Sequence, residues 1–237
     1  MKIAVISDIH ANWPALEAVL ADLPPVDDLV CLGDLVGYGA EPVRCLDYVR
    51  DRQWLTLLGN HDLACADRDV LEWFNEDAAT AIRWTVEQIG PERVEWLSER
   101  PPADRRDGAL LVHASPRSPV FEYVMDAESA AANLSELAGG LCFHGHSHLP
   151  GVFSLDGGRV RHDYKVGTVR LRGPVLVNPG SVGQPRDRDP DSSYGVWDTD
   201  AGTFEFRRVG YDRLAAQKAI LEAGLPARFA HRLEFGY

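Results

Sequence analysis

The sequence predicts an α/β fold in which two mixed β-sheets pack on each other and are flanked by helices. Short apolar runs at residues 2–7, 29–32, 54–58, 110–112 and 141–143 lack the alternation of a half-exposed sheet, which indicates buried strands. Stretches of helical period lie between these runs, and such alternation is typical of an α/β core. The chain after residue 150 is rich in further strands, which predicts a second sheet packed on the first.

Helices are predicted where apolar residues recur at intervals of three and four positions, because those positions share one helix face. The clearest sets are Leu16, Val19, Leu20 and Leu23, and Ala127, Ala130, Leu134 and Leu137. A third helix is expected to start at Asn75, a good N-cap residue, and to end at Pro91. A last helix is predicted over residues 212–222.

The strands of the second half are bounded by turn signals. Asp156, Gly157 and Gly158 separate two strand-like runs in GVFSLDGGRVRHDY and predict a hairpin. The segments PVLVNPG, SYGVWDTD and TFEFRRV add further strands, whereas residues 184–193 form a polar loop.

Length, composition and charge exclude several classes of protein. A chain of 237 residues that is 45% hydrophobic can bury a full core, and we expect a single domain over residues 1–237. The first apolar run is too short for a signal peptide or a membrane span, so a cytoplasmic protein without a membrane partner is expected. A net charge of −12 argues against binding of long nucleic acid. Four cysteines without paired spacing are expected to be reduced and structural.

Every early strand is followed by a side chain that metals favour. These residues are Asp8 and His10 after the first strand, Asp34 after the second, Asn60 after the third, His113 after the fourth, and His146 and His148 after the fifth. Groups at the carboxyl ends of strands in an open α/β sheet meet in one crevice. A spacing of two lets both side chains of an extended segment point the same way. We therefore expect one site built from distant segments.

The set of blocks D-x-H, G-D, G-N-H-D, H and G-H-x-H resembles the calcineurin-like metallophosphoesterases. The later segment NPGSVGQPR is similar to a loop of their small bacterial and archaeal members. The resemblance implies a four-layer αββα sandwich. It also implies an enzyme that hydrolyses small phosphodiesters or phosphomonoesters, cyclic nucleotides among them, through attack by a metal-bridging hydroxide.

The resemblance further implies which residues hold two divalent metal ions. Asp8, His10 and His148 would bind one ion, and Asn60, His113 and His146 the other, with Asp34 bridging both. Imidazole and carboxylate ligands without thiolate suit manganese, the first choice, and also iron, zinc, cobalt and nickel. His144 falls outside the pattern and is expected to be structural.

Other roles follow from position. By resemblance, His61 stabilises or protonates the leaving oxygen, and Asp62 orients its ring. Candidate contacts to the substrate phosphate are Asn12, Tyr38, Arg117 and Arg186, each a few residues beyond a predicted ligand or in the NPGSVGQPR loop.

Three alternatives to this hypothesis are disfavoured. Serine/threonine protein phosphatases are disfavoured because the chain reads GDLVGYG where they carry GDxVDRG. Repair nucleases are disfavoured by the acidic balance. The remaining alternative is a non-catalytic metal-binding scaffold for protein interactions, like the retromer subunit of the same fold. It is disfavoured because every ligand position is filled. The sequence carries no signature of oligomeric state.

Overall fold

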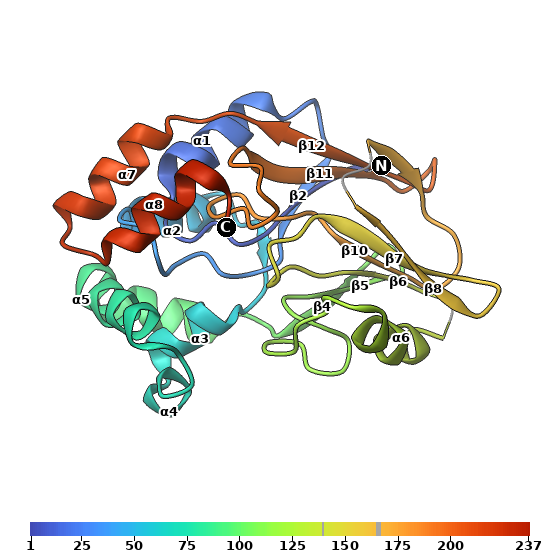
Figure 1. The fold of residues 1–237 in the computed structure, drawn as a ribbon, viewed down its shortest axis with the longest axis horizontal. Coiled ribbons are helices and arrows are strands. Elements are labelled where there is room, and N and C mark those ends of the chain that lie inside the picture. Colours follow the sequence, from blue (N-terminus) through green and yellow to red (C-terminus); the bar gives the residue numbers. More distant parts are fainter. Residues whose placement is uncertain (139, 165–166) are drawn as a thin grey trace.

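Two six-stranded mixed sheets form the centre of the molecule (Figure 1). A computed structural model describes residues 1–138, 140–164 and 167–237. The first sheet has the order β3-β2-β1-β11-β12-β9. Its strands are β1 (Lys2–Ile6), β2 (Asp28–Cys31), β3 (Leu55–Thr56), β9 (Thr168–Arg170), β11 (Ser192–Asp198) and β12 (Thr203–Val209).

The second sheet has the order β4-β5-β6-β10-β7-β8. Its strands are β4 (Ala103–Arg106), β5 (Ala109–Val112), β6 (Leu141–Phe143), β7 (Gly151–Asp156), β8 (Arg159–Tyr164) and β10 (Val175–Asn178). The strands β1, β2 and β3 run parallel in the first sheet, as do β5, β6 and β10 in the second, and the other pairs are antiparallel.

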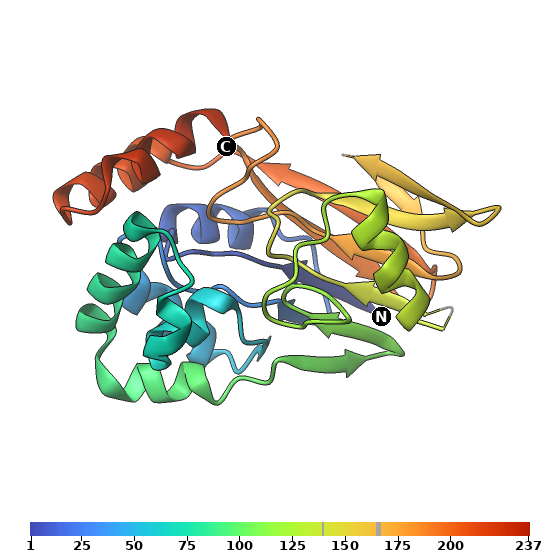
Figure 2. The same cartoon turned by 60° about the horizontal axis from the view of Figure 1, so that its bottom comes forward.

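Helices cover the outer faces of both sheets and extend beyond the sheets at one end of the molecule (Figure 1). They are α1 (Trp13–Asp22), α2 (Pro42–Asp51), α3 (Asn60–Ala66), α4 (Arg68–Leu71), α5 (Glu76–Ser98), α6 (Ala127–Glu136), α7 (Arg213–Glu222) and α8 (Ala227–Phe235). The α7–α8 pair, red in both views, lies at the same end of the molecule as the helices of the amino-terminal half (Figure 1 and Figure 2).

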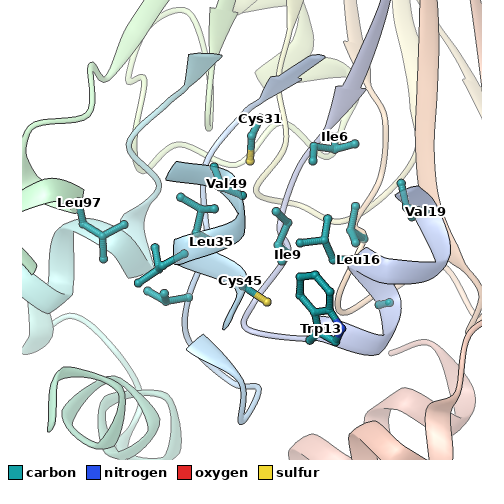
Figure 3. Packing of buried hydrophobic residues seen from close by; sticks show 14 of the residues in the cluster. Ile6, Ile9, Trp13, Leu16, Val19, Cys31, Leu35, Cys45, Val49 and Leu97 are labelled. Carbon is teal, nitrogen blue, oxygen red and sulfur yellow. The ribbon is translucent and has the colours of Figure 1, made fainter. Parts of the chain in front are cut away.

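Alternation along β1 shows why the sheets are layered. Ile3 and Val5 point into the core between the two sheets. Ala4 and Ile6 point to the opposite face and pack against α1 and α2, a core seen from close by in Figure 3. Because successive side chains of a strand alternate between faces, an all-apolar strand must be covered on both sides.

The second sheet is covered in the same way. Ala130 and Leu134 of α6 pack against Cys142 and Leu176 on the face turned away from the first sheet. Helices, two sheets and a further helix therefore form the four layers that the sequence predicts.

The distribution of strands differs from the expectation in one respect. The second sheet is not built from the chain after residue 150 alone, because β5 and β6 belong to it, whereas β11 and β12 belong to the first sheet. Apolar content shows that a strand is buried but carries no information about its neighbours.

The helices also bring corrections. Pro91 does not end the helix that starts at Asn75: the chain bends at Gly90 (φ 72°), and Pro91 opens a second segment that continues to Ser98. Proline suits the first helical position because it has no N–H to leave unpaired. Four of the described helices, α2, α3, α4 and α8, have no counterpart among the predicted ones.

All four cysteines are buried and free of disulfides, as expected. Among the described residues, no helix combines the length and apolar character that crossing a membrane requires.

Candidate metal centre

The loops that follow β1, β2, β3, β5 and β6 meet at one end of the two sheets. The backbone N–H of His10 donates to the carbonyl of Asp34 (3.0 Å), and that of Gly145 donates to the carbonyl of His113 (2.7 Å). These bonds hold the loops side by side. The loops converge as expected, but from two facing sheets rather than from the edge of one.

Two glycines allow this close approach. A Cβ on Gly59 would lie 2.1 Å from Oδ1 of Asp34. A Cβ on Gly145 would lie 1.9 Å from Oγ of Ser7 and 2.7 Å from Oδ2 of Asp8. The glycines of GNHD and GHSH are therefore demanded by loop packing.

The predicted ligands adopt a strained backbone. Five of the seven have φ between 48° and 64°: Asp8, His10, Asp34, His146 and His148. The left-handed region is uncommon for residues other than glycine, and such strain concentrates at functional sites. The surrounding hydrogen bonds must therefore hold these side chains in place.

The first donor group contains Asp8, His10, Asp34 and His148, whose ligand atoms lie within 4.8 Å of one another. The Nε2 atoms of His10 and His148 are 3.1 Å apart. Nε2 of His148 lies 3.3 Å from Oδ1 of Asp8, and Nε2 of His10 lies 3.5 Å from Oδ2 of Asp34. All four residues are buried.

The second donor group contains Asp34, His113 and His146. Nε2 of His113 lies 3.5 Å from Oδ2 of Asp34 and 3.2 Å from Nδ1 of His146. It also lies 3.1 Å from Oδ1 of Asn60, which brings the seventh predicted ligand into the cluster. Oδ2 of Asp34 is thus shared between the two groups.

Hydrogen bonds behind the imidazoles determine which nitrogen faces the centre. Nδ1 of His10 donates to the carbonyl of Val36 (2.9 Å), and Nδ1 of His113 donates to that of Leu32 (3.0 Å). In the same way, Nδ1 of His148 donates to a backbone carbonyl at 2.5 Å. Outer partners of this kind orient metal-binding histidines and leave the Nε2 lone pair free.

The donor set fits divalent cations. Burial lowers the pKa of His10 well below its usual value, so its ring is neutral. Facing lone pairs on the Nε2 atoms of His10 and His148 repel unless a cation lies between them. Burial is the largest effect that raises the pKa of Asp34 well above its usual range, and the negative charges of Asp62 and Asp8 raise it further. Among the described residues, no lysine or arginine forms an ion pair with Asp8 or Asp34, so bound cations would supply the missing positive charge.

His61 lies beside the first donor group. Its backbone N–H donates to Oδ1 of Asp34 (2.9 Å), and its ring centroid is 4.9 Å from that of His10 and 4.4 Å from that of Tyr38. Its Nδ1 is buried without a hydrogen-bond partner among the described residues. The ring is therefore held by packing and keeps its polar atoms uncommitted.

Asp62 does not orient the ring of His61 in this structure. Its Oδ1 accepts from the N–H groups of Leu35 (3.0 Å) and Val36 (3.2 Å), and its Oδ2 accepts from the N–H of Gly59 (3.1 Å). A buried carboxylate next to a histidine can accept hydrogen bonds from backbone N–H groups or from the histidine ring, and the sequence does not distinguish these roles. Here Asp62 holds the turn after β2 against the start of α3.

We expect Asp62→Ala to destabilise the fold by at least ~3 kcal/mol, because three buried N–H groups lose their acceptor at ~1–3 kcal/mol each. Urea unfolding measures the change. Asp67→Ala is the matched control, since Asp67 also accepts backbone N–H groups at a helix start but is exposed, and its loss should stay near ~1 kcal/mol. Equal losses for the two variants would contradict the structural role of Asp62.

Of the predicted substrate contacts, Tyr38 and Arg186 lie near the centre and two others have local roles. The ring of Tyr38 packs 4.6 Å from that of His10, and Nη2 of Arg186 reaches the Tyr38 hydroxyl at 3.4 Å. Asn12 instead caps α1 by accepting from the N–H of Ala15 (3.2 Å). Arg117 faces Glu122 at 3.8 Å, and among the described residues its guanidinium forms no ion pair with the donor groups.

Two nearby residues were not anticipated. The ring of Tyr123 stacks on that of His146, with the ring centroids 3.8 Å apart and the ring planes at 23°. Because Tyr123 is 48% exposed, it lies where the second donor group faces solvent. The carbonyl of Gln184 is the acceptor for Nδ1 of His148. Gln184 lies in the quoted NPGSVGQPR segment, whereas Tyr123 has no local signal. His144 is buried, and neither ring nitrogen has a partner among the described residues.

A family model decides the identity. Residues 1–202 match the calcineurin-like phosphoesterase superfamily domain. The chain belongs to the calcineurin-like phosphoesterase superfamily. A calcineurin-like phosphoesterase acts on phosphate esters, and members of the superfamily use divalent metals, which agrees with the buried Asp and His groups.

Two relatives of this calcineurin-like phosphoesterase match it over nearly their whole length, and another matches a short part of it. An uncharacterised protein of Methanocaldococcus jannaschii is 38% identical over 99% of the chain and 98% of its own length. The crystal structure of a metallophosphoesterase from Sphaerobacter thermophilus shares 39% identity and a TM-score of 0.90 over 100% of this chain and 99% of that one. A symmetrical bis(5'-nucleosyl)-tetraphosphatase of Actinobacillus pleuropneumoniae is 38% identical over 68 residues, 27% of this chain and 25% of its own.

Proposed function

We propose that this chain hydrolyses small phosphate esters at a centre of two divalent metal ions. The observation that supports the proposal most strongly is the position of Asp34, whose Oδ2 lies 3.5 Å from His10 on one side and 3.5 Å from His113 on the other. A carboxylate shared by two nitrogen-rich groups is the arrangement expected for a bridging ligand. Asp8, His10 and His148 would complete one set, and Asn60, His113 and His146 the other.

Bound ions would supply two effects, a nucleophile generated from water near neutral pH and neutralisation of the phosphoryl oxygens. The chain supplies orientation. The outer carbonyls fix the imidazoles, and Asp62 fixes the turn that carries Asp34. Histidine and carboxylate ligands suit manganese, iron, zinc, cobalt or nickel, and manganese is the first ion to test.

His61 would deliver a proton, or a hydrogen bond, to the leaving oxygen. The proposal is supported by its uncommitted Nδ1 and its place beside His10 and Tyr38. Burial lowers the pKa of His61 well below its usual value. Such a ring is neutral at pH 7, and its N–H would stabilise the leaving oxygen through a hydrogen bond.

Arg186 and Tyr38 would contact the substrate phosphate from the side of His61. Among the described residues Arg186 faces no carboxylate within 4.0 Å, and arginine binds phosphate through paired N–H groups. We do not assign such a contact to Asn12 or Arg117, because both are used by neighbouring protein groups.

The test is a substrate panel on protein loaded with each candidate ion. We expect turnover of bis-p-nitrophenyl phosphate and p-nitrophenyl phosphate with manganese, loss of turnover with a chelator, and two ions per chain by elemental analysis. Dinucleoside polyphosphates belong in the panel because of the similarity to the tetraphosphatase over 68 residues. If no ester is hydrolysed with any ion, the hydrolase proposal is wrong and the scaffold alternative is favoured.

A further inference from the structure

Two partly buried arginines next to the centre face no carboxylate among the described residues. The described arginines either face a carboxylate within 4.0 Å or are exposed, with two exceptions, Arg186 and Arg232. Both are partly buried. In a chain of net charge −12, two such cations without a carboxylate need an explanation.

The two guanidinium groups share one neutral acceptor. Nη2 of Arg186 donates to Oε1 of Gln184 at 3.0 Å, and Nη1 of Arg232 donates to the same oxygen at 3.5 Å. Nε of Arg186 is buried without a partner among the described residues. Burial is the largest effect that lowers the pKa of Arg232, and the positive charge of Arg186 is the second. The two guanidinium groups are therefore close enough to repel each other.

This arginine pair adjoins the metal centre. The backbone carbonyl of Gln184 is the acceptor for Nδ1 of the predicted ligand His148. Arg186 also reaches the hydroxyl of Tyr38, whose ring packs on His10. A phosphate bound by the pair would therefore lie beside the phosphate at the centre.

Arg232 is not needed to dock its own helix. The helix α8 packs on Tyr38 through Phe229, with ring centroids 4.9 Å apart, and Leu233 is buried in the same cluster. On the outer side of α8, Arg228 forms an ion pair with Asp77. Apolar packing and this ion pair secure the helix, which leaves the charge of Arg232 available for another role.

We propose that Arg186 and Arg232 form a subsite for a second, non-reacting phosphate of the substrate. This inference rests on the proposed phosphoesterase function and names its substrate class: compounds in which a second phosphate adjoins the phosphate that is attacked, as in a phosphoanhydride. Two guanidinium groups held together without a counterion repel each other. An anion that accepts hydrogen bonds from both groups offsets this repulsion. A simple monoester would engage Arg186 at most and would leave Arg232 without a phosphate.

The test compares two ligands that differ by one phosphate, AMP and adenosine 5'-(α,β-methylene)diphosphate, by calorimetry at a fixed free manganese concentration. We expect the wild type to bind the diphosphate analogue more tightly. In Arg232→Gln its affinity should fall ~10-fold or more, because a charge-assisted hydrogen bond is lost, with a smaller change for AMP. Arg188→Gln is the matched control, since Arg188 lies in the loop of Arg186, is exposed, and forms no ion pair with any residue that the structure describes. Equal loss for both ligands, or the same loss in Arg188→Gln, would overturn the subsite.

The failure of the subsite and that of the proposed function are separable. Turnover of bis-p-nitrophenyl phosphate by the wild type tests the function, whereas the difference in binding between the two ligands tests the subsite. If Arg232→Gln does not fold by circular dichroism, Arg232→Lys replaces it. The ammonium cannot make paired bonds, so the diphosphate affinity should still fall relative to Arg188→Lys. No difference between these two lysine variants would also overturn the subsite.

Discussion

Replacing Asp34 with alanine is expected to empty both metal positions. One carboxylate oxygen faces His10 and His113 at 3.5 Å each, so its removal takes a ligand from both donor groups at once. Loss of a mere supporting residue lowers metal affinity by up to ~100-fold, and loss of a shared ligand should exceed this. Hydrolysis should fall by at least ~10³-fold, since each ion contributes several kcal/mol to transition-state stabilisation.

The stoichiometry of bound metal distinguishes bridging from a general loss of structure. His113→Ala removes a ligand from the second group alone, so we expect one ion per chain where Asp34→Ala retains none. Mass spectrometry of metal content after gel filtration measures both, and circular dichroism confirms folding. Two ions per chain in folded Asp34→Ala would show that Asp34 does not bridge.

Replacing His61 with alanine is expected to lower turnover by ~10² to ~10⁴ while both ions stay bound. The backbone N–H of His61 still donates to Asp34 in this variant, and no predicted ligand is removed. The loss should be larger for phenyl phosphate than for p-nitrophenyl phosphate, because the poorer leaving group depends more on proton donation. A residue that only packs against Tyr38 would affect both esters equally.

The control for this experiment is His231→Ala, which removes an exposed imidazole from α8. Its turnover should match that of the wild type on both esters. Unchanged turnover in His61→Ala with two ions per chain would exclude His61 from the mechanism. A drop of equal size for the two esters would assign it a positioning role instead.

Much of the candidate site could be predicted because its signals are local. Each predicted ligand follows an apolar run, and Asp8 and His10, or His146 and His148, are separated by a single residue. The glycines at 59 and 145 stand where a Cβ would collide with the neighbouring loop. Such requirements involve only a few consecutive residues, so they can be recognised in the sequence without a structure.

Predictions that depended on a side-chain direction were less successful. Adjacency in sequence paired Asp62 with His61, whereas the structure directs the carboxylate to the N–H groups of Leu35, Val36 and Gly59. Asn12 follows a predicted ligand closely, yet it caps α1. A polar residue near a site can satisfy the backbone or the substrate, and only the positions of its neighbours decide which.

The sequence by itself determined the chemistry of this protein: which donors exist, that they end buried strands, and that helices must cover both faces of the sheets. Tertiary structure decided which sheet β5 and β6 join, which groups Asp62 serves, and that Tyr123 and Arg232 lie beside residues far away in the chain. Donor type and burial are properties of short segments. Contacts between distant segments depend on how whole helices and strands pack, so no single stretch of sequence determines them.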